Sequence, residues 1–337
     1  MTEEQPANEV PSSLSPQILA GDTSDVYFLR SHQIMEREGV NPRVTMEFFP
    51  SGDGILCGMR EVLALLGKAL PSESEVWALK EGEPFHLKEV VLRVTAPYLS
   101  FGIYETAILG ILAHESGWAT AARECVEAAQ GVPIVSFGAR HVHPAVVAVM
   151  DYAATVGGCV SCSSLAGAQL AGVNPSGTMP HAMIICFGDT VRAAIAFDKH
   201  MPPDVPRIVL VDTFHDEPEE SLRVAGALGD HLHGVRLDTP GERGSVTPDL
   251  VIEARARLDL AGFQHVKLLV SGGVNPGRIR EFLEAGAPVD SFGVGSYISG
   301  ARPIDFTADI KQVEGKAVAK RGRIPGIIAN PRLHRSI

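Results

Sequence analysis

The sequence predicts an α/β protein built on an incomplete parallel α/β barrel of six to seven strands, with an N-terminal α+β domain completed by the C-terminal segment. Short apolar runs alternate with helical stretches between Pro133 and Ile298, and such alternation is typical of parallel strands joined by right-handed crossovers. The run Ile208–Val211 stops abruptly at Asp212 and Thr213. This pattern indicates a strand that is buried on both faces and opens at the carboxyl edge of a barrel.

The first part of the chain mixes short strands with a few helices, which favours an α+β domain. A helix is expected over Thr23–Glu38, because Ser24 or Asp25 can cap it and an apolar face follows. The remaining expected elements are a strand at Val44–Phe49, a helix from Gly58 to Leu66, a strand at Glu75–Ala78, extended pieces over Pro84–Leu92 and a long helix at Tyr104–Ala129.

The barrel elements are expected from the recurring apolar runs. The third run is the least regular and is compatible with a loop. The expected strands are Ile134–Phe137, Cys159–Cys162, Ala182–Ile185, Ile208–Val211, Gly234–Leu237, Val266–Val270 and Val289–Val294, and the expected helices are Ala145–Thr155, Glu219–Leu228, Pro248–Ala261 and Pro276–Ala285.

These patterns divide the chain into four parts. Residues 1–15 are acidic and rich in Pro and Ser, as in a disordered tail, residues 16–130 form the α+β domain and residues 131–300 the barrel. Residues 301–337 are expected to return to the first domain, with a hairpin of basic character over Val313–Arg323.

Composition limits the classes of function. The net charge of −11 over 337 residues argues against a general nucleic-acid surface, whereas phosphorylated small molecules need only local cations and backbone amides. No apolar run approaches the length of a membrane span. Five cysteines do not make a disulfide framework in a chain of this length, so a reducing cytoplasm is expected.

Two glycine motifs follow the last two expected strands, Ser271-Gly272-Gly273 and Gly293-Val294-Gly295. Glycine lets backbone amides approach a phosphate closely, and the loops after the last strands are the usual phosphate site of such barrels. Each motif taken alone is equally compatible with a tight turn. Together they predict a phosphate site.

Charged residues end two central strands. Asp212 and Asp238 are suited to ribose hydroxyls or to Mg²⁺, and Arg236 to a phosphate. The alternative for Arg236 and Asp238 is a buried ion pair, because alternate residues of one strand face the same side.

Several other side chains have both a functional and a structural interpretation. Phe137 with Arg140 can hold a flat ring and its carboxylate, or Phe137 is core and Arg140 surface; Tyr27 shares this ambiguity. His181, in a glycine-led turn, is a candidate acid, base or phosphoryl acceptor, although lone histidines are more often structural. Cys159 and Cys162 have redox or zinc spacing but lie in a strand-like segment without a second pair, so they are expected in the core.

Taken together, these residues resemble the nicotinate phosphoribosyltransferases of the type II phosphoribosyltransferase group. The resemblance extends from about Asp25 to Gly326 and implies a dimer with shared active sites. It rests on Asp25-Val-Tyr27, Phe137-Gly-Ala-Arg140, Gly177-Thr-Met-Pro-His181, Leu210-Val-Asp-Thr213, Val235-Arg-Leu-Asp238, Ser271-Gly-Gly273, Phe292-Gly-Val-Gly295 and Lys320-Arg-Gly322.

The resemblance implies a role for each matched residue. Phe137 stacks on the pyridine ring with Tyr27 of the partner subunit on the other face, Arg140 contacts the carboxylate, and Ser163 favours an acid over an amide. His181 is phosphorylated by ATP. Asp212, Arg236 and Asp238 position phosphoribosyl pyrophosphate, with Asp212 and Asp238 on Mg²⁺, and the phosphate-binding residues are Ser271, Gly272, Gly273, Gly293, Gly295, Lys320 and Arg321.

The chain departs from that family in two places. The usual Thr-Arg-Arg is Ala139-Arg140-His141, so that one cation is replaced by a neutral or titratable group. The C-terminal segment has no cysteine, so no zinc module is expected.

The sequence thus predicts an ATP-coupled, ligase-classed nicotinate phosphoribosyltransferase of NAD biosynthesis, with Mg²⁺ and ATP, acting as a cytoplasmic homodimer or higher homo-oligomer. Four alternatives stay open. A quinolinate transferase would need more cations for a second carboxylate and a decarboxylation step; a nicotinamide transferase or a non-catalytic phosphate or nucleotide sensor would use the same barrel. An isomerase or aldolase would want a lysine at a strand's carboxyl end, and Lys267 stands at the wrong end.

Overall fold

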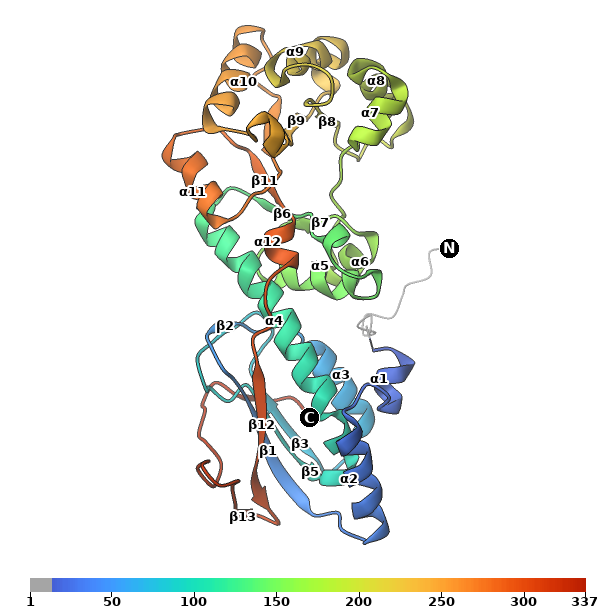
Figure 1. Ribbon diagram of the computed structural model, residues 1–337, viewed down its shortest axis with the longest axis vertical. Coiled ribbons are helices and arrows are strands. Elements are labelled where there is room, and N and C mark those ends of the chain that lie inside the picture. The colour runs from blue at the N-terminus through green and yellow to red at the C-terminus, as the bar shows by residue number, and fades with distance from the viewer. Residues whose placement is uncertain (1–13) are drawn as a thin grey trace. The chain divides into compact units, whose positions relative to one another are not determined.

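The computed structural model describes residues 14–337, so all but the last two residues of the predicted tail lie outside it. The described residues form two compact units (Figure 1). Unit 1 holds the described residues up to Thr120 together with Ala301–Ile337, and unit 2 holds Ala121–Gly300. Helix α4 (Glu105–Ala128) contributes residues to both.

Unit 1 contains a six-stranded sheet in the order β13-β12-β1-β5-β3-β14. The long strands β1, β5 and β12 pair antiparallel. Its strands are β1 (Arg43–Pro50), β3 (Glu75–Ala78), β5 (Leu92–Pro97), β12 (Phe306–Val313), β13 (Lys316–Ala317) and β14 (His334–Arg335), beside a small pair of β2 (Gly54–Ile55) and β4 (Pro84–Phe85), and its other helices are α1 (Pro16–Ala20), α2 (Val26–Arg37) and α3 (Met59–Ala69).

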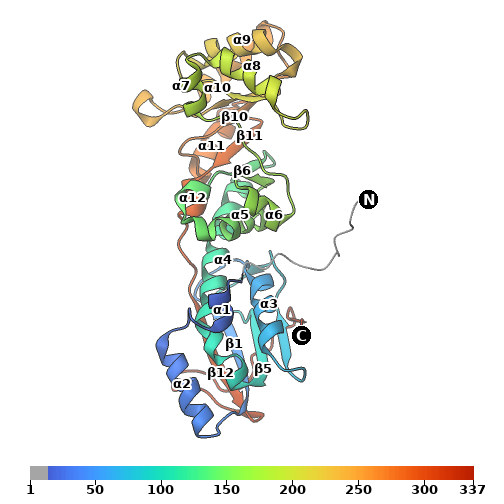
Figure 2. The same cartoon turned by 90° about the vertical axis from the view of Figure 1, so that its right-hand side faces the viewer.

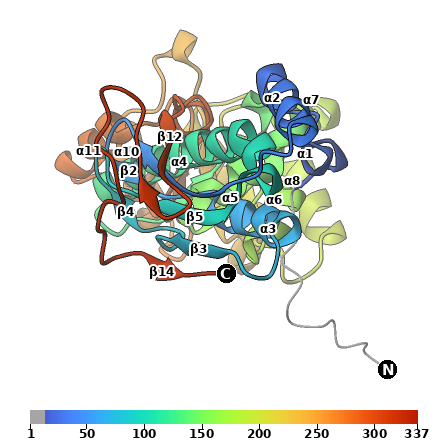
Figure 3. The same ribbon diagram turned by 90° about the horizontal axis from the view of Figure 1, so that it is seen from below.

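Helices α3 and α4 cover one face of this sheet (Figure 3). Strand β1 directs Val44, Met46 and Phe48 into the core, where they meet Leu65 and Leu66 of α3. Apolar side chains at every second strand position and at helical spacing on α3 account for this two-layer arrangement.

The opposite face of β1 is covered by the C-terminal segment. Glu47 on β1 is fully buried, and its carboxylate accepts hydrogen bonds from Arg93 Nε at 2.8 Å and from the backbone N–H of Ile328 at 3.2 Å. The segment therefore supplies part of the packing of this unit. The prediction that the C-terminal segment completes the N-terminal domain is confirmed.

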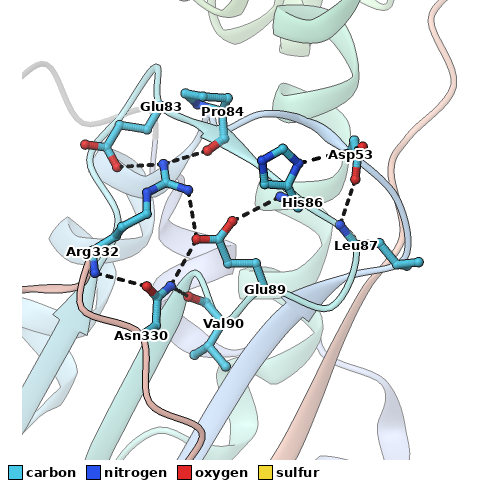
Figure 4. A network of polar contacts seen from close by, with 9 residues as sticks. All are labelled: Asp53, Glu83, Pro84, His86, Leu87, Glu89, Val90, Asn330 and Arg332. Atoms are coloured by element: carbon cyan, nitrogen blue, oxygen red, sulfur yellow. Dashed lines mark hydrogen bonds and ion pairs between the residues drawn. The ribbon is translucent and has the colours of Figure 1, made fainter.

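A polar network fastens the same segment to the β4–β5 region (Figure 4). Asn330 Nδ2 donates to Val90 O at 2.8 Å and to Glu89 Oε1 at 3.1 Å. Arg332 forms ion pairs with Glu89 at 2.8 Å and with Glu83 at 3.3 Å. The last residues are thus held by backbone and side-chain acceptors that lie about 240 positions earlier in the chain.

Unit 2 contains six parallel strands in the order β7-β6-β11-β10-β9-β8, which form a half-barrel. The helices of the unit pack round these strands (Figure 2). The elements are β6 (Ile134–Ser136), α5 (Val147–Val156), β7 (Ser161–Cys162), α6 (Leu165–Ala171), α7 (His181–Phe187), α8 (Thr190–His200), β8 (Ile208–Leu210), α9 (Glu217–Leu228), β9 (Gly234–Leu237), α10 (Pro248–Leu260), β10 (Lys267–Val270), α11 (Pro276–Glu284), β11 (Ser291–Val294) and α12 (Ser296–Ser299). The predicted fold class is confirmed.

The expected third barrel strand is wrong, because Ala182–Ile185 lies within helix α7. A short apolar run does not distinguish a strand from a helical turn, and here Gly188 ends the run in the left-handed conformation typical of a helix C-terminus. Since no strand forms between β7 and β8, these two remain the edges of the sheet. The barrel is incomplete at this position.

Replacing Asn330 with alanine should destabilise unit 1 measurably. Asn330→Ala removes both Nδ2 donors and leaves the Val90 carbonyl without its partner, so we expect a loss of about 1–3 kcal/mol in the free energy of unfolding. Urea titration followed by circular dichroism measures it. Arg335→Ala is the control, because among residues 14–337 the side chain of Arg335 hydrogen-bonds to the backbone carbonyl of Ile337. Equal losses in the two variants would contradict this role of Asn330.

Candidate active site

Unit 2 holds a cavity of about 410 Å³ at the carboxyl ends of its strands. Backbone pairing sets Leu237 beside Val270 and Val270 beside Phe292, so the residues that follow these strands meet at one edge. The predicted site residues that line the cavity are Phe137, Arg140, Ser163, Arg236, Asp238, Ser271, Gly272, Gly273, Gly293 and Gly295.

The glycines of the cavity are needed for two different reasons. Gly272 and Gly273 have φ values of +86° and +64°, which other residues rarely adopt. Gly293 instead lies within strand β11, where a β-carbon would stand 2.3 Å from Cε2 of Phe137. Its missing side chain makes room for the aromatic ring, a packing role that the sequence did not reveal.

Arg236 connects the aromatic ring to the acidic side of the cavity. Its guanidinium carbon lies 5.5 Å from the centre of the Phe137 ring, and its Nη2 lies 3.6 Å from Asp238 Oδ2. The ion pair considered from the sequence therefore forms, and both partners also line the cavity. Among the described residues, the buried Nε–H of Arg236 has no hydrogen-bond acceptor.

Arg140 and Arg236 bring two positive charges into the same cavity. Burial lowers the pKa of Arg236; Asp238 and Asp212 oppose this effect, while the positive charge of Arg140 lowers the pKa further. Two guanidinium groups that interact in this way repel each other, and an anion bound between them removes the repulsion.

A second cluster lies beside Asp238. His181, the first residue of α7, has its Nε2 at 3.5 Å from Asp212 Oδ2 and 3.8 Å from Asp238 Oδ2. Its Nδ1 lies 3.1 Å from Thr213 Oγ1. Ser271 Oγ donates to Asp238 Oδ1 at 2.8 Å.

Asp212 has an unusual environment. Its side chain is only 1% exposed, and neither oxygen accepts a hydrogen bond from a described residue. Burial raises the pKa of Asp212 to about 6; His181 lowers it and the negative charge of Asp238 raises it. The carboxyl group therefore carries a proton in part of the population near neutral pH.

Asp151 fixes the loop that carries Ser163, and the sequence did not reveal it. This fully buried residue of α5 accepts from Ser164 Oγ at 2.6 Å, from Ser164 N at 3.0 Å and from Ser136 Oγ at 2.9 Å. A single carboxylate in an otherwise apolar helix was the available signal. Burial raises the pKa of the nearby Cys162 thiol to about 12, and Cys159 is also buried, which confirms that this pair belongs to the core.

Three predicted site residues belong to unit 1 and are not among those lining the cavity. Tyr27 lies on α2 and is 57% exposed, and Lys320 and Arg321 follow β13 and are exposed. Their roles stay predictions. Lys267 begins β10 at its amino end, away from the carboxyl edge where an aldolase lysine would stand.

The expectation that Asp212 and Asp238 hold Mg²⁺ does not suit their surroundings. Asp238 already contacts Ser271, Arg236 and His181, and Nε2 of His181 lies 3.5 Å from Asp212 Oδ2. Within residues 14–337, the three potential metal ligands in mutual reach are Cys57, Glu81 and Glu115, in the other unit.

Comparison with known families follows the same division of the chain. The N-terminal domain model of quinolinate phosphoribosyl transferase matches residues 25–116, and its C-terminal domain model matches residues 118–309. The chain therefore belongs to the quinolinate phosphoribosyl transferase family.

The solved structures that resemble the chain include nicotinate-nucleotide pyrophosphorylase from Pyrococcus furiosus. It is 43% identical, with a TM-score of 0.86 over 97% of this chain and 82% of that one. Human nicotinic acid phosphoribosyltransferase shares the fold, with a TM-score of 0.70 and 18% identity over 90% of this chain and 77% of that one.

The curated proteins that resemble the chain are named nicotinate phosphoribosyltransferases, unlike the family models. Nicotinate phosphoribosyltransferase pncB2 of Mycobacterium tuberculosis (strain ATCC 25618 / H37Rv) is 33% identical over 232 residues, 66% of this chain and 48% of the relative. The chain thus spans about half the length of the curated relatives it matches.

The prediction of an ATP-coupled, ligase-classed nicotinate phosphoribosyltransferase is wrong. The family models and the Pyrococcus furiosus structure favour a quinolinate phosphoribosyltransferase instead, and that family is not ATP-coupled. The predicted cofactor set of Mg²⁺ and ATP is therefore also wrong. The surroundings of His181 give a physical reason, because Thr213 occupies its Nδ1 and two carboxylates, which repel a phosphoryl group, face its Nε2.

Among residues 14–337, none of the helices combines the length and the apolar character that crossing a membrane requires.

The raised pKa of Asp212 makes stability depend on pH. Because the folded-state value of about 6 exceeds the ordinary 3.8, the stabilising contribution of the neutral acid is present below pH 3.8 and is lost as the pH rises through about 6. Asp212→Asn mimics the neutral acid. We expect it to match the parent protein near pH 4 and to exceed it at pH 8, by on the order of 2 kcal/mol.

Thermal unfolding between pH 4 and pH 8 checks this expectation. The exposed Asp204 supplies the control, because Asp204→Asn also removes one carboxylate but at a position outside this cluster. A melting-temperature difference between Asp212→Asn and the parent that does not vary with pH would exclude a protonated Asp212.

Proposed function

We propose that the protein transfers a phosphoribosyl group from phosphoribosyl pyrophosphate to quinolinate, giving nicotinate mononucleotide, pyrophosphate and CO₂. Membership of the quinolinate phosphoribosyl transferase family supports this reaction. The structural observation that carries it is the presence of two interacting arginines, Arg140 and Arg236, in one cavity.

The charge of the substrate distinguishes the candidate acids. Quinolinate carries two carboxylates on neighbouring ring carbons, and nicotinate carries one. Two guanidinium groups close enough to affect each other match a vicinal dicarboxylate, because each can face one carboxylate. His141 also lines the cavity and can add a third positive charge when protonated.

The aromatic ring has a defined place. Phe137 sits against Gly293 with Arg236 over its face, so its orientation is fixed before any ligand binds. A flat pyridine ring can stack on the exposed part of such a side chain. Fixing the ring also fixes the direction in which its nitrogen points.

The phosphate groups of the second substrate have a candidate site next to the ring. Ser271, Gly272 and Gly273 connect β10 to α11, and the left-handed glycines turn the backbone at the amino end of a nine-residue helix. Backbone N–H groups at such an end attract phosphate. Lys320 and Arg321 stay predicted phosphate ligands outside the cavity lining.

The proposed reaction has two stages. The ring nitrogen first forms a bond to the anomeric carbon as pyrophosphate departs, and Arg236 and the glycine amides offset the charge of the phosphates. The quaternised nitrogen then acts as an electron sink, so that the C2–carboxylate bond breaks and CO₂ leaves. The residues of this chain orient the ring, place the leaving carboxylate beside Arg140 or Arg236 and exclude water from the carbanion.

The proposal includes the predicted homodimer with shared active sites and the cytoplasmic location. Helix α2 has no buried residue, and Val26, Tyr27 and Ile34 on it are each more than half exposed. An apolar helix surface of this kind suits contact with a second copy of the chain, from which Tyr27 would reach the partner's ring site. The cysteines of the chain are all free, as in a reducing compartment.

A substrate comparison tests the reaction. We expect purified protein with phosphoribosyl pyrophosphate and quinolinate, without ATP, to release CO₂, pyrophosphate and nicotinate mononucleotide in equal amounts. Nicotinate should react more slowly by at least about 100-fold in kcat/KM, equivalent to ~3 kcal/mol from one lost charge-assisted contact. Coupled pyrophosphate detection and chromatography of the nucleotide measure both reactions.

In the same assay, Arg140→Leu tests the contribution of the cavity arginine. Arg192→Leu is the matched control, because Arg192 lies on the exposed surface of α8. Arg140→Leu should abolish quinolinate turnover, and Arg192→Leu should leave it unchanged. Faster turnover of nicotinate than of quinolinate by the parent protein would overturn the proposed function.

A further inference from the structure

Asp151 on α5 joins two segments of chain that carry side chains of the cavity. It is fully buried, and its Oδ1 accepts a hydrogen bond from Ser136 Oγ at 2.9 Å. Its Oδ2 accepts from Ser164 Oγ at 2.6 Å and from Ser164 N at 3.0 Å. Ser136 immediately precedes Phe137, and Ser164 immediately follows Ser163. Since Phe137 and Ser163 both line the cavity, one carboxylate connects two parts of its wall.

Glycines let both segments approach α5 closely. A β-carbon at Gly167 would stand 2.3 Å from Cβ of Asp151, so no side chain fits there on the existing backbone. A β-carbon at Gly138 would lie 2.9 Å from Cε of Met150, the residue of α5 that precedes Asp151. Helix α5 is therefore in direct contact with α6 and with the chain that follows Phe137.

The hydroxyl of Ser164 is held from two directions. It donates to Asp151, and it accepts from the backbone N–H of Gly167 at 3.1 Å, where it caps α6. A hydroxyl has one hydrogen to donate, and here that hydrogen is used on Asp151. The turn that carries Ser163 is consequently fixed on its carboxyl side.

A carboxylate is the group suited to this position. All three donors to Asp151 are neutral, and burying a charge is costly unless hydrogen bonds compensate it. A carboxylate accepts at both oxygens, whereas an amide of the same shape accepts at one and donates at the other. Only the carboxylate can therefore accept from the Phe137 segment and the Ser163 segment at once.

We propose that Asp151 is a positioning residue that holds Phe137 and Ser163 in a fixed relation, so that the cavity binds the pyridine ring of its acid substrate in one pose. This inference rests on the proposed function, in which the ring stacks on Phe137. Asp151 acts through these two residues, because it is not among the described residues that line the cavity. A ring free to tilt directs its nitrogen away from the anomeric carbon part of the time, which weakens binding in the reactive pose.

Two variants break the connection at different points. Asp151→Asn offers an acceptor to one segment only, and Ser136→Ala removes the donor next to Phe137. Asp290→Asn is the matched control, because Asp290 Oδ2 also accepts from a backbone N–H, that of Leu268 at 2.8 Å, but near the amino end of β10.

Steady-state rates with varied quinolinate and varied phosphoribosyl pyrophosphate measure the effect. In Asp151→Asn and Ser136→Ala, the KM for quinolinate should rise about tenfold, as expected when one hydrogen bond to a charged group is lost. The KM for phosphoribosyl pyrophosphate should stay within about twofold, and Asp290→Asn should match the parent protein in both constants. A merely structural role for Asp151 would leave both KM values unchanged in the folded protein or raise them together. Either result overturns the inference.

A second measurement needs no substrate. In protein labelled with fluorophenylalanine, with the Phe137 signal assigned from Phe137→Leu, the fluorine resonance of Phe137 should shift or broaden in Asp151→Asn and in Ser136→Ala. It should stay unchanged in Asp290→Asn. A Phe137 resonance that is the same in the parent protein and in both site variants overturns the positioning role directly. If the parent protein does not convert quinolinate, the proposed function fails, while this resonance still decides whether Asp151 positions Phe137.

Discussion

Charge buried at the shared carboxyl edge of six parallel strands determines the chemistry of this protein. Within the part of the chain that the structure describes, Asp212 has no hydrogen-bond donor and its side chain is only 1% exposed, and Asp238 is a second carboxylate close enough to raise its pKa. An arrangement of this kind costs stability unless a proton or a cation compensates it. Arg236 supplies a cation beside Asp238, Nε2 of His181 lies 3.5 Å from Asp212 Oδ2, and burial raises the pKa of Asp212 to about 6.

The half-barrel explains why these groups meet. Strands β8, β9, β10 and β11 follow one another in the sheet in chain order, and β11 pairs with β6. Their register brings the residue after each strand to the same edge. The gap lies between β7 and β8, where α7 stands in place of a strand, and α7 begins with His181. The incompleteness of the barrel is therefore what brings a helix terminus, and with it the histidine, beside the acids.

Much of this architecture was predictable, because a continuous apolar run that ends in a polar residue marks a buried parallel strand and its carboxyl end together. That relation correctly grouped Phe137, Arg140, Arg236, Asp238 and the glycines. It failed at Ala182–Ile185, since a short apolar run has no periodicity that separates strand from helix. Thr213, Asp151 and the packing role of Gly293 depend on contacts between distant segments, so linear spacing contained no sign of them.

The substrate was misassigned for a related reason. A single carboxylate and its arginine can be inferred from one motif, but the mutual effect of Arg140 and Arg236 depends on β6 and β9 being brought together by β10 and β11. Relatives named for nicotinate match 44–54% of their own length, whereas the quinolinate family models span both units. In this proposal, discrimination between quinolinate and nicotinate therefore depends on the number of positive charges that face the pyridine ring of the substrate.

Calorimetric titration with inert ring acids measures that property most directly. Phthalate presents two vicinal carboxylates and benzoate presents one, and neither has a ring nitrogen that can react. We expect phthalate to bind at least about tenfold more tightly than benzoate, the difference of one charge-assisted contact of ~1.4 kcal/mol or more, and we expect Arg236→Met to remove this advantage. Benzoate binding as tightly as phthalate to the parent protein would contradict a cavity built for a dicarboxylate.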